Sequence, residues 1–359
     1  MISDRELLLA TANRKKEERI LYYAQFAGEC QRKVFEYFGV NNQDEFATSQ
    51  GFFNPKTVRP IRAEGAPIYD YSKYFSEIKI PQGVKIESDG ILNLPGSQHH
   101  FTHLISPLRD IYEEDEIYDL PVYRNPEHFD FSNMKTEICQ LHNKGIVATS
   151  PICRLFETSW PLRGYENMLV DMLINEDVAN YFLDNELKWN MELVTQSVNS
   201  GIDMLVFGDD VGNQKGMTFS ATLWRQMLKP RWAQIFTLAK KINPNVVLWY
   251  HSCGDVTDIV PDLIEIGLDI LNPVQPECMD PYGIYQKYGD KLSFDGGIGT
   301  QKLMPFGTPD EIATEMKKVV DIVGARGGLI LSPSHVLEPE VPMENIITFI
   351  KTAQKICIR

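Results

Sequence analysis

The sequence has no long apolar run and no surplus of basic charge. No stretch approaches the roughly 20 consecutive apolar residues that a membrane-spanning helix needs, and the charged N-terminal stretch MISDRELLLATANRKKEER has no signal-peptide core. Lys and Arg total 35 against 49 Asp and Glu, and the resulting charge of -14 argues against binding a nucleic-acid phosphate backbone. We therefore expect a cytoplasmic protein with neither a membrane nor a nucleic acid as partner.

The chain also lacks densely spaced cysteines, internal repeats, low-complexity tracts and an evident linker. Its six cysteines are scattered, unlike those of a small disulfide-stabilised domain, so reduced thiols are expected. A cysteine with a special role would then be a metal ligand or a nucleophile. The 359 residues, 43% of them hydrophobic, can form a sizeable core, and nothing divides residues 1–359 into separate domains.

From about residue 140, short apolar runs alternate with longer amphipathic stretches, which is typical of βα units around a parallel sheet. Such strands are covered on both faces and therefore have near-continuous apolar sequences. The predicted strands are Gly145–Thr149, Met204–Gly208, Val246–Tyr250, Leu268–Asn272, Lys291–Asp295 and Leu329–Ser332.

The helices between these strands have recognisable ends. Thr308 with Glu311 forms a capping box that predicts a helix ending at Gly324, and a second helix is expected over Leu223–Ile242 with a kink at Pro230. Nearer the N-terminus we expect a helix over Arg5–Lys16, a strand over Arg19–Gln25, a helix over Cys30–Phe38 and a hairpin over Val84–Leu94. The prediction is an α/β fold, a single TIM-type (β/α)8 barrel with an N-terminal helical extension and a β-hairpin insertion at about 80–105.

Chemistry in such a barrel is expected where the strands end. Polar residues stand at five predicted strand ends: Asp209 and Asp210, His251 and Cys253, Asn272 and Gln275, Asp295, and His335. A three-ligand zinc site formed by His251, Cys253 and His335 would leave an open position for catalysis. Alternatively, Cys253 is a small buried hydrophobe and His251 hydrogen bonds to a carboxylate such as Asp210.

The adjacent pair Asp209 and Asp210 also allows two interpretations. One of them could be a general base, a metal ligand or a partner of His251, or it could cap a helix. Neighbouring strand residues point to opposite faces, so at most one should enter the pocket. Glu157 and Arg163, in FETSWPLRGYEN, are candidate substrate-binding residues, as are Asn272, Gln275 and Asp295, although Arg163 could equally form a salt bridge at a helix start.

Several long stretches resemble the uroporphyrinogen decarboxylase superfamily, whose members are (β/α)8 barrels that include decarboxylases and cobalamin-linked methyltransferases. These stretches include FETSWPLRGYENMLVDML, FGDDVGNQKGMTFSATLWRQMLKPR, YHSCGDVTDIVPDLIEIGLDILNPVQPECMD and GGLILSPSHVLEPEVPMENI. The methyltransferase branch binds zinc through a His-x-Cys pair and a later cysteine. The pair matches His251 and Cys253, and His335 lies in the stretch that carries the later cysteine.

The resemblance implies a zinc-dependent methyltransferase that moves a methyl group between a corrinoid or small methylated compound and a thiol acceptor. His251, Cys253 and His335 would hold the metal, and Asp210 or Asp209 would orient a ligand or handle a proton. The cofactors expected are Zn²⁺ and a corrinoid, the latter as substrate or carried by a partner protein. A homodimer is also compatible with the resemblance.

True decarboxylases of the family carry a Met-Arg-Gln-Ala-Gly-Arg motif whose arginines bind substrate carboxylates. Gln25 and Glu29 stand at those positions here, so Gln25 is a candidate substrate-binding residue without a charge. A polycarboxylate would meet like charge in this acidic chain. Two alternatives remain open: a carboxy-lyase acting on a tetrapyrrole or another carboxylated substrate, and a non-catalytic protein that binds a corrinoid or tetrapyrrole.

Overall fold

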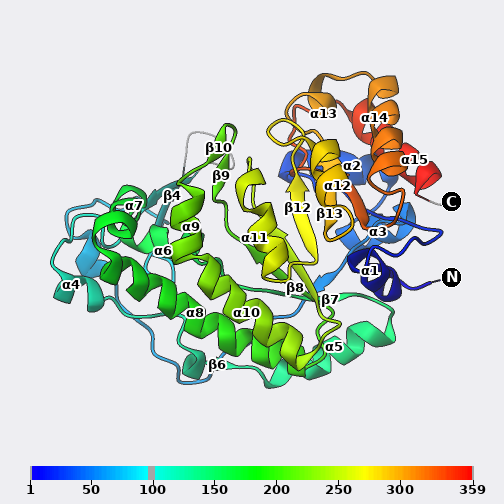
Figure 1. Cartoon of the computed structure of the whole chain (residues 1–359). Helices are drawn as coiled ribbons and strands as arrows, with labels where there is room; N and C mark the ends of the chain where they lie inside the picture. Colours follow the sequence, from blue (N-terminus) through cyan, green and yellow to red (C-terminus); the bar gives the residue numbers. More distant parts are fainter. Residues whose placement is uncertain (1, 96–101, 358–359) are drawn as a thin grey trace.

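The computed structural model describes residues 2–95 and 102–357 and has an eight-stranded parallel sheet at its centre (Figure 1). The spatial order of the strands is β1-β14-β13-β12-β11-β8-β7-β2, and every neighbouring pair is parallel. The bounds are β1 (Leu21–Tyr22), β2 (Lys56–Thr57), β7 (Ala148–Pro151), β8 (Met204–Gly208), β11 (Val247–His251), β12 (Ile270–Val274), β13 (Ser293–Ile298) and β14 (Leu329–Pro333). The α/β class and the parallel sheet agree with the prediction.

The sheet curls so that its two outer strands approach each other. The backbone N–H of Phe53, just before β2, donates to the carbonyl of Tyr22 in β1 across 2.8 Å. β1 and β2 share no ladder of paired residues in the described part of the chain. The structure therefore shows a curled parallel sheet whose outer strands approach each other, which is the coarser part of the barrel prediction.

The described chain contains α-helices, several of which flank the curled sheet (Figure 1). They are α1 (Asp4–Ala12), α2 (Gly28–Phe38), α3 (Gln43–Gln50), α4 (Glu114–Tyr118), α5 (Ser132–Asn143), α6 (Phe156–Arg163), α7 (Tyr165–Ile174), α8 (Glu176–Asn199), α9 (Ala221–Met227), α10 (Lys229–Ile242), α11 (Val260–Glu265), α12 (Pro281–Tyr288), α13 (Leu303–Phe306), α14 (Pro309–Ile322) and α15 (Met343–Ile356). Among the helices, α8 packs against α10, and α14 packs against α15. No helix in the described ranges has the length and apolar character needed to cross a bilayer.

Helix ends follow the local sequence rules. Thr308 and Glu311 form the predicted capping box at the start of α14, and Gly39 ends α2 with a φ of 66°. The predicted helix over 223–242 is divided into α9 and α10 at Leu228, and Pro230 lies in the first turn of α10. Proline is tolerated there because first-turn N–H groups have no partner within the helix, so the break precedes the proline.

α1 closes the end of the sheet at which the strands begin. Leu7 and Leu8 are 1% exposed and pack in one cluster with the first residues of three strands, Met204, Val247 and Ile270. Burying such side chains contributes about 1.5–3 kcal/mol each. Side chains of α1 therefore pack against the end of the sheet at which these strands begin.

The region between β2 and α5 contains two short antiparallel pairs. β3 (Ile61–Arg62) pairs with β6 (Phe129–Asp130), and β4 (Leu92–Pro95) pairs with β5 (Thr102–Ile105). The hairpin predicted over 84–94 is represented by a single bridge between Ile86 and Leu92. Residues 96–101 of the predicted 80–105 insertion lie outside the described residues.

Candidate metal centre

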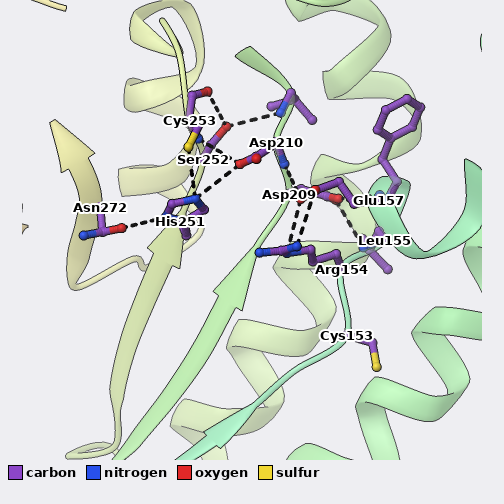
Figure 2. Close-up of polar contacts among 12 residues, drawn as sticks. Cys153, Arg154, Leu155, Glu157, Asp209, Asp210, His251, Ser252, Cys253 and Asn272 are labelled. Carbon is purple, nitrogen blue, oxygen red and sulfur yellow. Dashed lines mark hydrogen bonds and ion pairs between the residues drawn. The ribbon is translucent and has the colours of Figure 1, made fainter. Parts of the chain in front are cut away.

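The candidate site lies where the neighbouring strands β8 and β11 end. His251, the last residue of β11, pairs with Gly208, the last residue of β8. Asp210 follows β8 by two residues, and Cys253 follows β11 by two residues. The parallel register therefore brings the loops that follow β8 and β11 together at the carboxyl ends of these strands (Figure 2).

Three potential ligand atoms converge in these loops. Sγ of Cys253 lies 3.3 Å from Nε2 of His251, and Oδ1 of Asp210 lies 3.4 Å from the same nitrogen. All three atoms are within 4.8 Å of one another, and no other such group of His, Cys, Asp or Glu is found in ranges 2–95 and 102–357. An imidazole nitrogen, a thiol sulfur and a carboxylate oxygen are the donors that Zn²⁺ accepts in proteins.

Neighbouring side chains fix the orientation of the His251 ring. Nδ1–H of His251 donates to Oδ1 of Asn272 across 2.6 Å, so Nε2 is left facing Cys253 and Asp210. The ring also stacks on Trp249, with centroids 6.1 Å apart and planes 18° apart. Burial lowers the pKa of His251, against the opposing effect of Asp210. A neutral imidazole oriented through its other nitrogen is the form that binds a metal.

The environment of Cys253 is unfavourable for a thiolate without a bound cation. Burial, followed by the charges of Asp210 and Glu157, raises the pKa of the thiol to about 12. A metal ion would reverse this balance because its charge stabilises the thiolate. The donor set and its negative surroundings therefore fit a divalent metal.

Hydrogen bonds fix both the carboxylate and the backbone of Asp210. Its carboxylate accepts the backbone N–H of Cys253 across 2.8 Å, and its own N–H donates to Oε2 of Glu157 across 2.6 Å. Arg154 pairs with the same Glu157 oxygen at 3.2 Å (Figure 2). The sequence had not pointed to Arg154, although an arginine three residues before Glu157 on a helix start is a recognisable ion-pair spacing.

Asp209 points away from this centre and holds the start of α6. Its carboxylate accepts the backbone N–H groups of Leu155, Phe156 and Glu157 at 3.2, 3.0 and 2.9 Å. The side chain is fully buried, and burial raises its pKa to about 8. Both aspartates follow the end of β8, and only Asp210 lies beside His251 and Cys253. Asp209 is the structural one, and it caps α6.

Glycines allow the two loops to pack closely. Gly254 has a φ of 81°, and a Cβ there would overlap the backbone of Asn213. Asn213 belongs to the small hairpin of β9 (Gly212–Asn213) and β10 (Gly216–Met217), and its carbonyl accepts the N–H of Asp255 at 2.9 Å. The glycine after Cys253 is therefore required by backbone packing beside the centre.

The structure does not bring His335 into the group. Its side chain is exposed, and Nδ1 lies 3.4 Å from the carbonyl oxygen of the adjacent Val336. The influence of His335 on the pKa of His251 ranks below those of burial, Asp210, Asn272 and Arg154. In the described residues, the third potential ligand atom beside His251 and Cys253 belongs to Asp210 and not to His335.

The predicted substrate-binding residues have different locations. Asn272 contacts His251, and Gln275 accepts the Gly254 N–H at 3.2 Å, so both support the centre. Glu157 supports Asp210. Arg163 is 3% exposed, forms a 2.6 Å ion pair with Asp171 and donates to two backbone carbonyls, so it is a core residue and not a substrate ligand.

The remaining two predicted residues, Gln25 and Asp295, line a cavity of about 480 Å³ inside the curled sheet. Its wall includes Thr149 of β7, Val206 of β8 and Trp249 of β11. Trp249 joins the cavity to the candidate centre, because its ring also stacks on His251. A volume of this size is within the range of small-molecule pockets.

Comparison with known proteins identifies the family of the chain. The family model described as uroporphyrinogen decarboxylase (URO-D) matches residues 153–356, more than half of the chain. A methylated-thiol–coenzyme M methyltransferase from Methanosarcina mazei is 22% identical over 252 residues, which cover 66% of this chain and 64% of that relative. The chain thus matches slightly less than two thirds of that relative's length.

A solved structure described as a methyltransferase from Methanosarcina mazei superposes with a TM-score of 0.67 at 14% identity, covering 99% of both chains. At that identity the match establishes the fold alone. The family match spans the strand ends that carry Asp210, His251 and Cys253. The chain belongs to the uroporphyrinogen decarboxylase (URO-D) family.

Proposed function

We propose that this protein is a zinc-dependent methyltransferase in which Asp210, His251 and Cys253 hold the metal. The observation that carries the proposal is the convergence of their nitrogen, sulfur and oxygen atoms within 4.8 Å at the ends of β8 and β11. Three protein ligands leave a fourth position for a substrate, which is the arrangement of catalytic zinc. The similarity to a methylated-thiol–coenzyme M methyltransferase supports methyl transfer as the reaction class.

The proposed reaction moves a methyl group between a corrinoid or small methylated compound and a thiol. Zinc, when bound, would stabilise the thiolate form of the thiol substrate at neutral pH. In the methylating direction the thiolate sulfur forms a bond to the methyl carbon, while the bond from methyl to its carrier breaks and the carrier keeps the electron pair. The proton of the thiol is released to solvent. A corrinoid protein is the proposed carrier.

The residues of the chain would keep the ligand set in position. Asn272 accepts a hydrogen bond from Nδ1–H of His251 and so would direct Nε2 toward the metal. Glu157, paired with Arg154, holds the backbone of Asp210. Such supporting contacts contribute to affinity because the ligands do not have to be ordered when the metal binds.

A decarboxylase acting on a polycarboxylate is less well supported. None of the residues that line the cavity in the described chain is Arg, Lys or His, and Asp295 adds a carboxyl group. Substrate carboxylates would lose water there without gaining an ion-pair partner. The cavity therefore does not favour this alternative.

The test is zinc stoichiometry and methyl transfer in matched variants. Wild-type protein and His335→Ala are expected to hold about one zinc ion per chain, whereas Asp210→Ala and Cys253→Ala are expected to lose it. Zinc-loaded wild type should also demethylate methylcobalamin in the presence of a small thiol, with the cobalamin absorbance change as readout.

Each contrary result has a distinct meaning. A wild-type protein that takes up no zinc would refute the metal centre. Loss of zinc in His335→Ala together with retention in Asp210→Ala would show that His335 is the third ligand. A zinc-loaded protein that binds corrinoid and transfers no methyl group to any thiol would instead be a binding protein.

A further inference from the structure

The cavity beside the candidate centre contains one charged residue. Among the residues that line it in the described chain, Asp295 of β13 alone carries a charge. The other polar groups on the wall are neutral amides and hydroxyls, including Gln25, Asn54 and Thr149. The electrostatic character of the cavity is therefore set by one carboxyl group.

Asp295 has no basic partner in the described residues. It is 2% exposed, and its carboxylate accepts hydrogen bonds from the Tyr23 hydroxyl at 3.1 Å, the Trp249 indole N–H at 2.8 Å and the Ser332 hydroxyl at 2.8 Å. These neutral donors orient the carboxylate without cancelling its charge. A buried charge without a counter-ion is costly, so its location on a cavity wall suggests that a ligand supplies the counter-charge.

The cavity wall is also rich in aromatic rings. Tyr23, Phe26, Phe53 and Trp249 all line it. Aromatic faces attract organic cations, and a cage of such rings is the usual means of recognising quaternary or methylated ammonium groups. A strongly hydrated inorganic cation would gain less from this wall, because it has to give up water for apolar rings. The overall charge of -14 also favours the approach of a cation over that of an anion.

We propose that this cavity binds the organic ammonium group of a small substrate, with Asp295 as its counter-ion and the aromatic rings as its cage. Trp249 contacts the cavity on one side and stacks on His251 on the other, so a cation bound here lies next to the metal centre. As an assignment of substrate class, the inference rests on the proposed methyltransferase function. Cation binding itself does not require metal.

The test compares three molecules of the same shape and different charge: choline, neutral 3,3-dimethylbutan-1-ol and anionic 3,3-dimethylbutanoate. Binding is measured by titration calorimetry and tryptophan fluorescence at fixed ionic strength, with wild-type protein freed of metal by a chelator. Choline is expected to bind about tenfold or more tightly than the neutral alcohol, and the anion is expected not to bind. This comparison needs no variant that could misfold.

Two variants then locate the site. Asp295→Asn keeps the size of the side chain and removes its charge, so it should lower choline affinity about tenfold or more and leave that of the neutral alcohol unchanged. The matched control Asp210→Asn should lose zinc and keep choline binding. Choline and alcohol binding equally to wild type, or choline binding unchanged in Asp295→Asn, would overturn the proposal.

The outcome is separable from that of the zinc experiment. A protein that discriminates choline from the alcohol but takes up no zinc would leave the cation site standing and remove the proposed function. A protein that holds zinc and transfers methyl groups but shows no charge discrimination would refute the cation site alone.

Discussion

Nδ1 of His251 donates a hydrogen bond to Oδ1 of Asn272 across 2.6 Å and so links the last residue of β11 to the middle of β12. The bond determines which ring nitrogen carries the proton, and the unprotonated Nε2 faces Cys253 and Asp210. Asn272 therefore prepares the imidazole for metal binding before any metal is present.

Removing this bond should weaken metal binding without removing a ligand. Asn272→Ala is expected to lower zinc affinity about 10- to 100-fold, measured by competition with a chromophoric chelator. Asn272→Gln, which retains a neutral amide oxygen as a potential acceptor for Nδ1–H, is the matched control and should lose less affinity than Asn272→Ala. Equal affinity in wild type and Asn272→Ala, with an unchanged circular dichroism spectrum, would show that Asn272 has no part in orienting the ring.

Asp209 should contribute to the free energy of unfolding and have little effect on zinc affinity. Asp209→Asn replaces one of the two oxygens that accept the N–H groups of Leu155, Phe156 and Glu157, so at least one buried donor at the start of α6 loses its partner. We expect a loss of about 1–3 kcal/mol in the free energy of unfolding, measured by urea denaturation. An active-site role would be indicated instead if the variant were as stable as wild type and inactive.

Unlike Asp209, the ionised side chain of Asp295 should lower the free energy of unfolding at neutral pH. Burial raises its pKa from 3.8 to about 6, so the folded state retains the proton more strongly than the unfolded state. The protonated side chain therefore contributes its full stabilisation below about pH 4. This stabilisation is lost as the pH rises through about 6 and Asp295 ionises in the folded protein. A shift of this size corresponds to about 3 kcal/mol at most.

Asp295→Asn removes this penalty and still has groups to pair with Tyr23, Trp249 and Ser332. We expect the variant to be about 1–3 kcal/mol more stable than wild type at pH 7 and similar in stability near pH 4. Urea denaturation at both pH values measures the difference. A variant less stable than wild type at pH 7 would mean that the charge of Asp295 is compensated in the folded protein.

The thiol of Cys253 should be unreactive in metal-free protein. Because its pKa is raised to about 12, only a small fraction is thiolate at pH 8, and the thiolate is the reactive form. Iodoacetamide should therefore alkylate the exposed Cys139 at least about tenfold faster than Cys253. Peptide mass spectrometry over a time course provides the two rates, and comparable rates would contradict the assigned environment.

Local sequence patterns predicted the main elements because their causes are local. Continuous apolar runs located β8 over residues 204–208 and the other central strands to within a few residues, and the Thr308 capping box located the start of α14. The short strand β1 was predicted too long, because only Leu21 and Tyr22 have a ladder partner in β14. Strand length depends on the neighbour, and the neighbour is more than 300 residues away in sequence.

The sequence by itself determined that His251 and Cys253 stand together at a strand end, because both follow the apolar run within a few residues. It also led to the prediction that at most one of the adjacent aspartates enters the pocket. Only the tertiary structure decided that Asp210 lies beside His251 and Cys253, that Asp209 caps α6 and that His335 lies outside the group.

The physical reason is that these assignments depend on which strands are neighbours and in what register. Pairing of His251 with Gly208 brings the loop of Asp210 to the imidazole. The burial of Arg163 against Asp171 and the enclosure of Asp295 among neutral donors likewise arise from packing between distant segments. A local pattern supplies the chemical groups, whereas long-range register and packing determine which of them meet.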